Sequence, residues 1–288
     1  MKKIFIPTSF NQIKETINYV DAYLIGVKDM SVNLPNYYTI DELKEINAYL
    51  KQNNKELFVS VNKNIHNHEL NNLKNILTKL NELDIKAVFY YDLAIPNLKD
   101  KLNLKYDLVW AQEHLTNNYY TCNYWYNHGV KYTHLSSEIT MHEILEIKEN
   151  TNMKLIVSIF GFSPIFTSKR NLVKNYLKTF NISDNSNLNY IEKEGNIYPV
   201  NDEVQGTTVY SSKILNATIE IPNLEKYNFD YILINSFNIK NDIMLEVLKK
   251  INIINDSNKE QISKEIDTLL DDKIDTGFMY KETIYKVK

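Results

Sequence analysis

Cysteine is almost absent from this chain of 288 residues, in which Cys122 is the only one. A single thiol cannot form an intramolecular disulfide. It also cannot supply the several thiolates that an iron–sulfur cluster or a cysteine-ligated zinc needs. We therefore expect no iron–sulfur cluster and no stoichiometric zinc. Because the sequence assigns no histidine and asparagine partners to Cys122, we expect buried filler rather than a nucleophile.

The chain also lacks an excess of charge and a long apolar run. Its 33 basic and 36 acidic side chains leave a net charge of −3 and a pI of about 6.1. No broad positive field therefore indicates nucleic-acid binding, although the balance does not exclude it. The first apolar run is too short for a signal peptide, and none approaches the roughly 20 residues of a membrane helix. We expect a cytoplasmic protein with no membrane partner.

Short apolar runs rich in β-branched residues alternate with helical patterns along most of the chain. The expected strands span residues 3–6, 22–26, 57–61, 87–91, 108–111, 132–135, 156–160 and 231–234. Thr39 is placed to cap one of the helices between them. Eight short strands with helical partners favour a closed (β/α)8 barrel of the TIM type over an open sheet. We expect one barrel domain over residues 1–288.

One segment, residues 181–228, breaks this alternation. Three β-like runs separated by turn residues lie within it, at 189–192, 197–200 and 205–210. We expect a small antiparallel insertion between the seventh and eighth strands, on the rim of the barrel. After the last helix, residues 275–288 are expected to form one more strand or an extended cover.

The stretch 154–176 concentrates the features of a site. A continuous apolar run predicts a strand buried on both faces, and Gly161 and Pro164 predict a tight turn after it. Ser168 is placed to cap the following helix, and Arg170 lies at its opening. Arg170 is the only arginine among 33 basic residues. Its planar fork suits a carboxylate or phosphate, as lysine does not; the alternative is an arginine that pins a loop.

In such a barrel, catalytic and ligand-binding residues lie where the strands end and the following loops begin. The polar and small residues at those positions are Gly26, Asn62, His66, His68, Glu69, Asp92, Gln112, Glu113, His114, Ser136, Ser137, Glu138 and Arg170. We expect five of them to converge at one end of the barrel: Asn62, Gln112, Glu113, Glu138 and Arg170. The ligand-binding candidates among all these residues and their neighbours are Arg170, Lys169, Ser168, Asn62, Gln112 and His68.

The catalytic candidates are Glu113 and Glu138, which could form a general acid–base pair across the barrel mouth. Alternatively, one of them is the ion partner of Arg170 or Lys169.

His66, His68 and Glu69 invite a metal interpretation. Their spacing is not that of a His-Glu-x-x-His zinc helix, and they lie at a helix start, where such residues serve as caps. We expect no metal at this position.

An aromatic segment follows the fifth expected strand and contains Tyr119, Tyr120, Tyr124, Trp125 and Tyr126. A platform for stacking nucleobases is one interpretation. Packing of an aromatic helix against the barrel is the more common reason for such a pattern, and we favour it.

Several segments together resemble a known family. They are residues 116–125, 135–141 and 144–150, then 167–172 with 175–176, and also 61–62 with 66–70, 275–280 and 283–285. They are similar to the U-32 family of collagenase-like peptidases, in particular to its short branch linked to prephenate-dependent 5-hydroxylation of the wobble uridine of tRNA. The resemblance implies a barrel and a role in tRNA modification more than proteolysis. It implies no tightly bound cofactor, a small carboxylate such as prephenate as a ligand, and tRNA and a longer paralogue as partners.

The chain departs from the family pattern at four positions. Phe160 and Pro164 stand where the family commonly has histidine and cysteine, Ser137 stands in place of an arginine, and Asn235 in place of an acid. Three functions therefore remain open: a tRNA-hydroxylation protein, a catalytically reduced binding or assembly subunit that works with a longer paralogue, and a peptidase.

Overall fold

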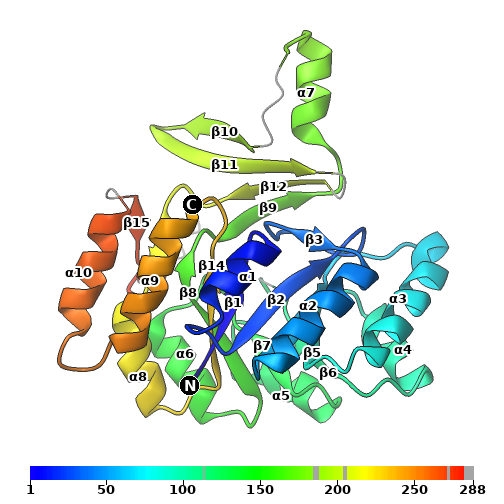
Figure 1. Ribbon diagram of the computed structural model, residues 1–288, viewed down its shortest axis with the longest axis horizontal. Helices are drawn as coiled ribbons and strands as arrows, with labels where there is room; N and C mark the ends of the chain where they lie inside the picture. Colours follow the sequence, from blue (N-terminus) through cyan, green and yellow to red (C-terminus); the bar gives the residue numbers. More distant parts are fainter. Residues whose placement is uncertain (113, 184–187, 204–205, 271–272, 282–288) are drawn as a thin grey trace, which may run out of the picture.

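The computed structural model describes residues 1–112, 114–183, 188–203, 206–270 and 273–281, and within them a closed parallel barrel (Figure 1). Its strands are β1 (Lys2–Ile6), β2 (Ala22–Val27), β4 (Glu56–Val61), β5 (Ala87–Tyr90), β6 (Asp107–Trp110), β7 (Tyr132–His134), β8 (Lys154–Gly161) and β14 (Tyr231–Asn235). Each pairs in parallel with the next, and β14 closes the barrel by pairing with both β8 and β1. The predicted (β/α)8 barrel is confirmed. A short strand, β3 (Tyr37–Tyr38), extends the sheet beside β2.

Helices pack around the outside of the barrel (Figure 1). They are α1 (Phe10–Thr16), α2 (Ile40–Gln52), α3 (Leu70–Glu82), α4 (Ala94–Lys101), α5 (Tyr119–Asn127), α6 (Met141–Glu149), α8 (Ile221–Lys226), α9 (Asn241–Ile253) and α10 (Lys259–Leu269). Thr39 caps α2 as predicted, in a capping box in which Thr39 and Glu42 each bind the other's backbone N–H. Within the described residues, no helix has the length and apolar character needed to cross a membrane.

Two apolar layers hold the barrel together. One lies between the helices and the outer face of the strands, and the other fills the barrel interior. Inside, the ring of Phe58 makes edge-to-face contacts with Phe89, Tyr132 and Tyr231 at centroid distances of 5.4–6.2 Å. Large rings therefore fill this part of the interior, and a cavity lies above them toward the carboxyl ends of the strands.

A second sheet stands on that end of the barrel, and we call it, together with its helix, the arm (Pro164–Tyr210; Figure 1). It consists of β9 (Pro164–Ser168), β10 (Leu188–Lys193), β11 (Asn196–Glu203), β12 (Gly206–Tyr210) and α7 (Leu172–Phe180). The four strands are antiparallel in the order β10-β11-β12-β9.

The start of the arm corrects two predictions. Pro164 opens a strand rather than a tight turn, because β12 offers β9 an antiparallel partner. Ser168 ends that strand and does not cap α7, whose N-cap residue is Asn171. The Ser168 hydroxyl instead accepts a hydrogen bond from the backbone N–H of Arg170.

After the arm, the chain returns to the barrel within the segment expected to be an insertion. The strand β13 (Ile214–Asn216) pairs antiparallel with the end of β8. Near the C-terminus, β15 (Ile274–Asp275) pairs in parallel with β13. The expected C-terminal cover therefore begins beside a short strand, and its residues 282–288 lie outside the described part.

Gly161 is required where β8 meets β14. Its φ of +113° lies in the left-handed region, and a Cβ there would lie 2.2 Å from the carbonyl oxygen of Asn235. Only glycine permits this close approach. It brings the end of β8 against the end of β14, where the barrel mouth begins.

Candidate functional site

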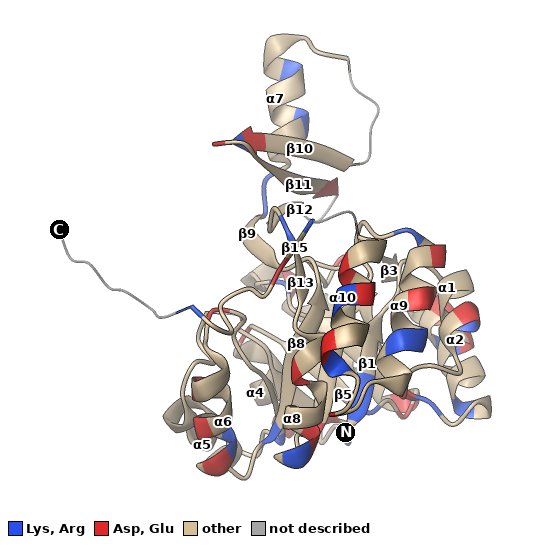
Figure 2. Cartoon of the chain, turned by 90° about the vertical axis from the view of Figure 1, so that its left-hand side faces the viewer, with Lys and Arg blue, Asp and Glu red and all other residues tan. Residues whose placement is uncertain are grey.

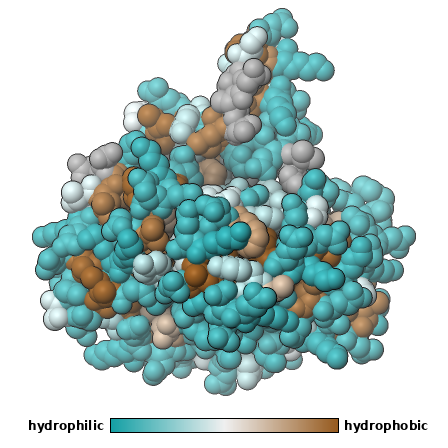
Figure 3. Space-filling view, in the orientation of Figure 1, coloured by the Kyte–Doolittle hydropathy of each residue, from teal (hydrophilic) through white to brown (hydrophobic). Residues whose placement is uncertain are grey.

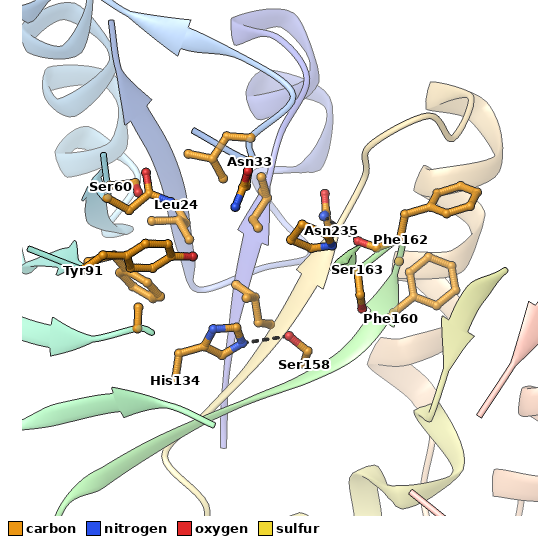
Figure 4. Close-up of a pocket in the computed structure, with 18 residues that line it drawn as sticks. Leu24, Asn33, Ser60, Tyr91, His134, Ser158, Phe160, Phe162, Ser163 and Asn235 are labelled. Atoms are coloured by element: carbon orange, nitrogen blue, oxygen red, sulfur yellow. Dashed lines mark hydrogen bonds between the residues drawn. The ribbon is translucent and has the colours of Figure 1, made fainter. Parts of the chain in front are cut away.

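A small cavity of about 70 Å³, which we call the floor chamber, lies in the centre of the barrel mouth (Figure 4). Its polar lining side chains are Asn33, Ser60, Asn62, His134, Ser158, Ser163 and Asn235. Apolar side chains such as Leu24, Phe89 and Phe160 line the rest. The described lining contains no lysine, arginine, aspartate or glutamate, so the floor offers hydrogen bonds but no permanent charge.

His134 and Ser158 form a pair at the bottom of this chamber. They come from the adjacent strands β7 and β8, and His134 Nε2 lies 2.8 Å from Ser158 Oγ (Figure 4). Burial lowers the pKa of His134 to about 4, so the imidazole is neutral at neutral pH. A neutral imidazole hydrogen-bonded to a hydroxyl can donate to or accept from a ligand, and it can take a proton from one.

Sequence reasoning missed this pair, because it examined only the residues that follow each strand. His134 and Ser158 lie within their strands. The available signal was a histidine as the last residue of one strand and a serine within the apolar run of the next strand along the chain.

Two asparagine side chains hold the walls of the floor chamber. Asn235 donates to the carbonyl of Phe162 and accepts from the N–H of Phe237, each at 3.0 Å. Asn33 Oδ1 accepts from the hydroxyls of Thr167 and Thr208, each at 2.8 Å. Because these threonines belong to β9 and β12, Asn33 ties the arm to the barrel mouth.

A wider cavity of about 260 Å³, the vestibule, shares Asn33, Asn62 and Tyr91 with the floor chamber and therefore continues it. Its further polar lining residues are Lys63, Asn64, Gln112, His114, Thr167 and Lys169. Lys169 Nζ donates to the carbonyl of Asn64, and no carboxylate of the described residues lies within ion-pair distance of it. The cavity therefore changes from an uncharged floor to a rim that carries a cation.

Asn62 and Gln112, both predicted to bind ligand, line this cavity. The Asn62 amide is engaged at both ends, since Oδ1 accepts from Val32 N at 2.8 Å and Nδ2 donates to Val32 O at 3.0 Å. Its visible role is to hold the loop after β2. Gln112 lines the vestibule beside His114.

The cluster after β4 has structural roles. His68 is exposed, stacks on His66 at 5.8 Å and lines neither cavity described above. Glu69 accepts from the N–H of His66 and pairs with Lys63 at 2.7 Å, as expected of a cap residue. Asp92 accepts from the N–H of Ile65. Among the described residues, no group of three or more histidine, cysteine or acidic side chains is placed to hold a metal ion.

Glu113, one of the two catalytic candidates, lies outside the described residues, so its acid–base pairing with Glu138 stays a prediction. Glu138 lines a third cavity of about 520 Å³ on the outer rim, together with Ser137. Its Oε1 lies 3.4 Å from Nδ1 of His114. Of the two glutamates offered as the ion partner of Arg170 or Lys169, Glu138 thus contacts a histidine, and for Glu113 the pairing stays a prediction.

Arg170 lies between β9 and α7, with its side chain exposed on the arm. The anion site expected at this helix start is already occupied by the protein. Leu172 N donates to Thr207 Oγ1 at 2.8 Å, and Lys174 N donates to Asp202 Oδ2 at 2.9 Å. The first N–H groups of α7 thus bind a hydroxyl and a carboxylate of the arm itself.

The aromatic segment packs as predicted at its centre. Trp125 stacks on Trp110 at 4.4 Å, and Cys122 is buried, which raises the pKa of its thiol to about 12. The thiol is therefore an inert part of the core, in agreement with the prediction. Tyr120 remains 73% exposed on the outer surface.

The fold and its mouth define a (β/α)8-barrel protein with a small, uncharged binding floor. The sequence profile of peptidase family U32 matches residues 8–287, and the chain belongs to that family.

The chain is also similar to individual proteins. It is 28% identical to tRNA hydroxylation protein P2 of Bacillus subtilis over 309 residues, covering 99% of this chain and 100% of that protein. It is 22% identical to tRNA hydroxylation protein P1 of the same organism, covering 59% of this chain and 40% of P1. An uncharacterized protease of Methanocaldococcus jannaschii is 30% identical over 52% of this chain and 37% of its own length.

Among solved structures, N-acetylneuraminate lyase from Fusobacterium nucleatum is similar with a TM-score of 0.50. The match has 9% identity and covers 94% of this chain and 82% of the lyase. At that identity, the likeness shows the barrel fold alone.

Proposed function

We propose that this protein takes part in the hydroxylation of tRNA, at the 5-position of the wobble uridine. The observation that carries the proposal is the extent of the similarity to tRNA hydroxylation protein P2, which spans essentially the whole of both chains. A match of that extent includes the barrel and the arm together, and not only the barrel that many unrelated enzymes share.

The ligand that suits the mouth is a small molecule with a carboxylate at one end, such as prephenate. The uncharged floor, with the pair His134–Ser158, suits a neutral ring or hydroxyl group. Lys169 at the vestibule suits the carboxylate. Because the floor is uncharged and the rim carries a cation, we expect such a ligand to bind with its carboxylate toward the rim and its ring or hydroxyl group toward the floor.

A catalytically reduced binding or assembly subunit is the second candidate. Phe160, Pro164 and Asn235, which are neutral in this chain, all line the floor chamber, and Ser137 lines the outer cavity. In this alternative, a longer paralogue similar to P1 supplies the charged groups, and this chain supplies the binding surface.

Proteolysis is the third candidate. Ser158 with His134 is a hydroxyl beside an imidazole, which is the pair that a serine nucleophile needs. Within the described residues, however, no carboxylate contacts His134 to orient it as in a catalytic triad.

The test is mass spectrometry of tRNA nucleosides from a strain in which the gene is deleted, with and without a plasmid copy. We expect 5-hydroxyuridine derivatives to fall on deletion and to return with the wild-type copy. Unchanged levels in the deletion strain would rule out the proposed role. If the purified protein binds prephenate and the wild-type copy restores the modification only when the paralogue is present, the second candidate is favoured.

A further inference from the structure

The segment that joins β9 to α7, with the helix itself, carries charge of one sign. Lys169, Arg170, Lys174 and Lys178 lie within it, and no acidic residue occurs from Lys169 to Ser183. In Figure 2 the ribbon of α7 carries the colour of basic residues and not that of acidic ones. In a chain with a net charge of −3, this is a local concentration of positive charge that includes the only arginine.

Within the described residues, no carboxylate lies within ion-pair distance of these four basic side chains. Asp202 accepts a hydrogen bond from the backbone N–H of Lys174, and burial raises the pKa of the Glu203 carboxyl. The other described acids of the arm, Glu192 and Glu194, lie at the β10–β11 turn. The positive charge of the α7 segment is therefore available to a partner.

Aromatic side chains lie exposed on the same segment and on the sheet beneath it. No residue of α7 is buried, and Tyr176 and Phe180 are 57% and 62% exposed, with their rings 4.7 Å apart. Phe166 and Tyr190 are also at least half exposed, beside an open apolar cavity of about 660 Å³ between α7 and the sheet. Figure 3 shows hydrophobic surface on the arm around β10 and β11.

The basic segment is continuous with the mouth of the barrel. Lys169 lines the vestibule, and Arg170 is the next residue along the arm. The contacts of Thr167 and Thr208 with Asn33 hold the arm over the mouth. A nucleic-acid backbone that followed α7 toward its first residues would thus reach the vestibule, where one of its bases could enter.

We propose that the arm is the surface that docks tRNA, with Arg170, Lys174 and Lys178 contacting phosphates and Tyr176 and Phe180 stacking on unpaired bases. This inference rests on the proposed function, because it takes tRNA as the substrate. Cations beside exposed rings are the usual means of binding single-stranded loops of RNA. Lysine is depleted in protein–protein interfaces, so four basic residues in this segment favour RNA over a protein partner.

The test compares two triple variants that remove equal charge. Arg170→Gln, Lys174→Gln and Lys178→Gln change the arm. Lys55→Gln, Lys101→Gln and Lys105→Gln change one half-buried and two exposed lysines near the amino-terminal ends of β4 and β6, at the other end of the barrel. Both triple variants and the wild type are assayed by fluorescence anisotropy with an unmodified tRNA transcript at several salt concentrations.

We expect the arm variant to bind at least about tenfold more weakly and the control to bind as wild type. The slope of log affinity against log salt should fall by about 2, because each lost phosphate contact contributes about 0.7. Tyr176→Ala with Phe180→Ala should weaken binding while leaving the slope unchanged, since stacking releases no counterions. Thermal melting of every variant separates these effects from loss of the fold.

Equal binding by the arm variant and wild type would overturn the inference, as would a wild-type protein that does not bind the transcript. Sedimentation in which the aromatic variant loses self-association but keeps tRNA binding would assign the arm to a protein partner instead. If the gene deletion lowers tRNA hydroxylation while arm variants bind tRNA normally, the docking inference fails and the proposed function stands.

Discussion

His134 Nε2 lies 2.8 Å from Ser158 Oγ, and the two residues come from neighbouring parallel strands at the floor of the barrel mouth. The contact joins an imidazole that burial keeps neutral to a hydroxyl that faces the same cavity. The rest of the floor is lined by uncharged polar side chains, such as Asn33 and Asn235, and by apolar ones.

The first prediction is a dependence of stability on pH that arises from His134. Between pH 6.5 and about 4, the unfolded chain binds a proton at this residue and the folded chain does not. The contribution to the free energy of unfolding is therefore complete above pH 6.5 and is lost as the pH falls through this window. At 1.36 kcal/mol for each pKa unit, it is on the order of 3 kcal/mol.

Urea unfolding of wild type and His134→Gln at several pH values measures this contribution. The stability difference between the two proteins should change by that amount between pH 7 and pH 4. Parallel curves would show that the imidazole titrates normally in the folded protein.

The second prediction concerns Ser158. Ser158→Ala removes one neutral hydrogen bond and should lower the free energy of unfolding by only about 1 kcal/mol. If the floor binds the ligand, complementation by this variant should restore less than about a tenth of the tRNA hydroxylation that wild type restores. Thermal melting checks the change in stability, and nucleoside mass spectrometry checks the restored level of tRNA hydroxylation. If the variant restores hydroxylation to the wild-type level, the ligand does not bind at Ser158.

The third prediction separates backbone conformation from close packing at two glycines. Gly161 and Gly195 both have positive φ, at +113° and +76°. A Cβ at Gly161 would overlap the Asn235 carbonyl, whereas at Gly195 nothing lies within 4 Å. Gly195→Ala should therefore cost about 1 kcal/mol, the price of the backbone conformation alone. Gly161→Ala should cost about 4 kcal/mol or more, measured by denaturant unfolding.

The fourth prediction concerns Glu69. Desolvation raises its pKa, but hydrogen bonds from Lys63 and the His66 N–H outweigh it and lower the pKa to about 2. Its contribution to stability is therefore complete above pH 4.5 and is lost as the pH falls toward 2. At pH 7, Glu69→Gln should lower the free energy of unfolding by about 1–3 kcal/mol. Exposed Glu45 provides the control, since Glu45→Gln should change it by less than about 0.5 kcal/mol.

Local patterns along the chain were enough to determine the barrel and several details of it. Each helix or strand needs an apolar face, and the spacing of apolar residues that forms this face involves only neighbouring residues in the sequence. The alternation of apolar runs with helical patterns therefore predicts a (β/α)8 barrel. Thr39 caps α2 for the same reason, since its partner Glu42 is three residues away. The buried state of Cys122 likewise follows from its place on an aromatic helix.

Tertiary structure alone decided the contacts between distant residues. Pro164–Ser168 is a strand because β12, about 40 residues later, pairs with it, and no local pattern contains that partner. Glu138 meets His114 rather than Lys169, and His134 meets Ser158, because strand register and barrel closure set which side chains come within a few ångströms. A site built from several strands depends on those long-range pairings, so its members could be proposed from the sequence while their partners could not.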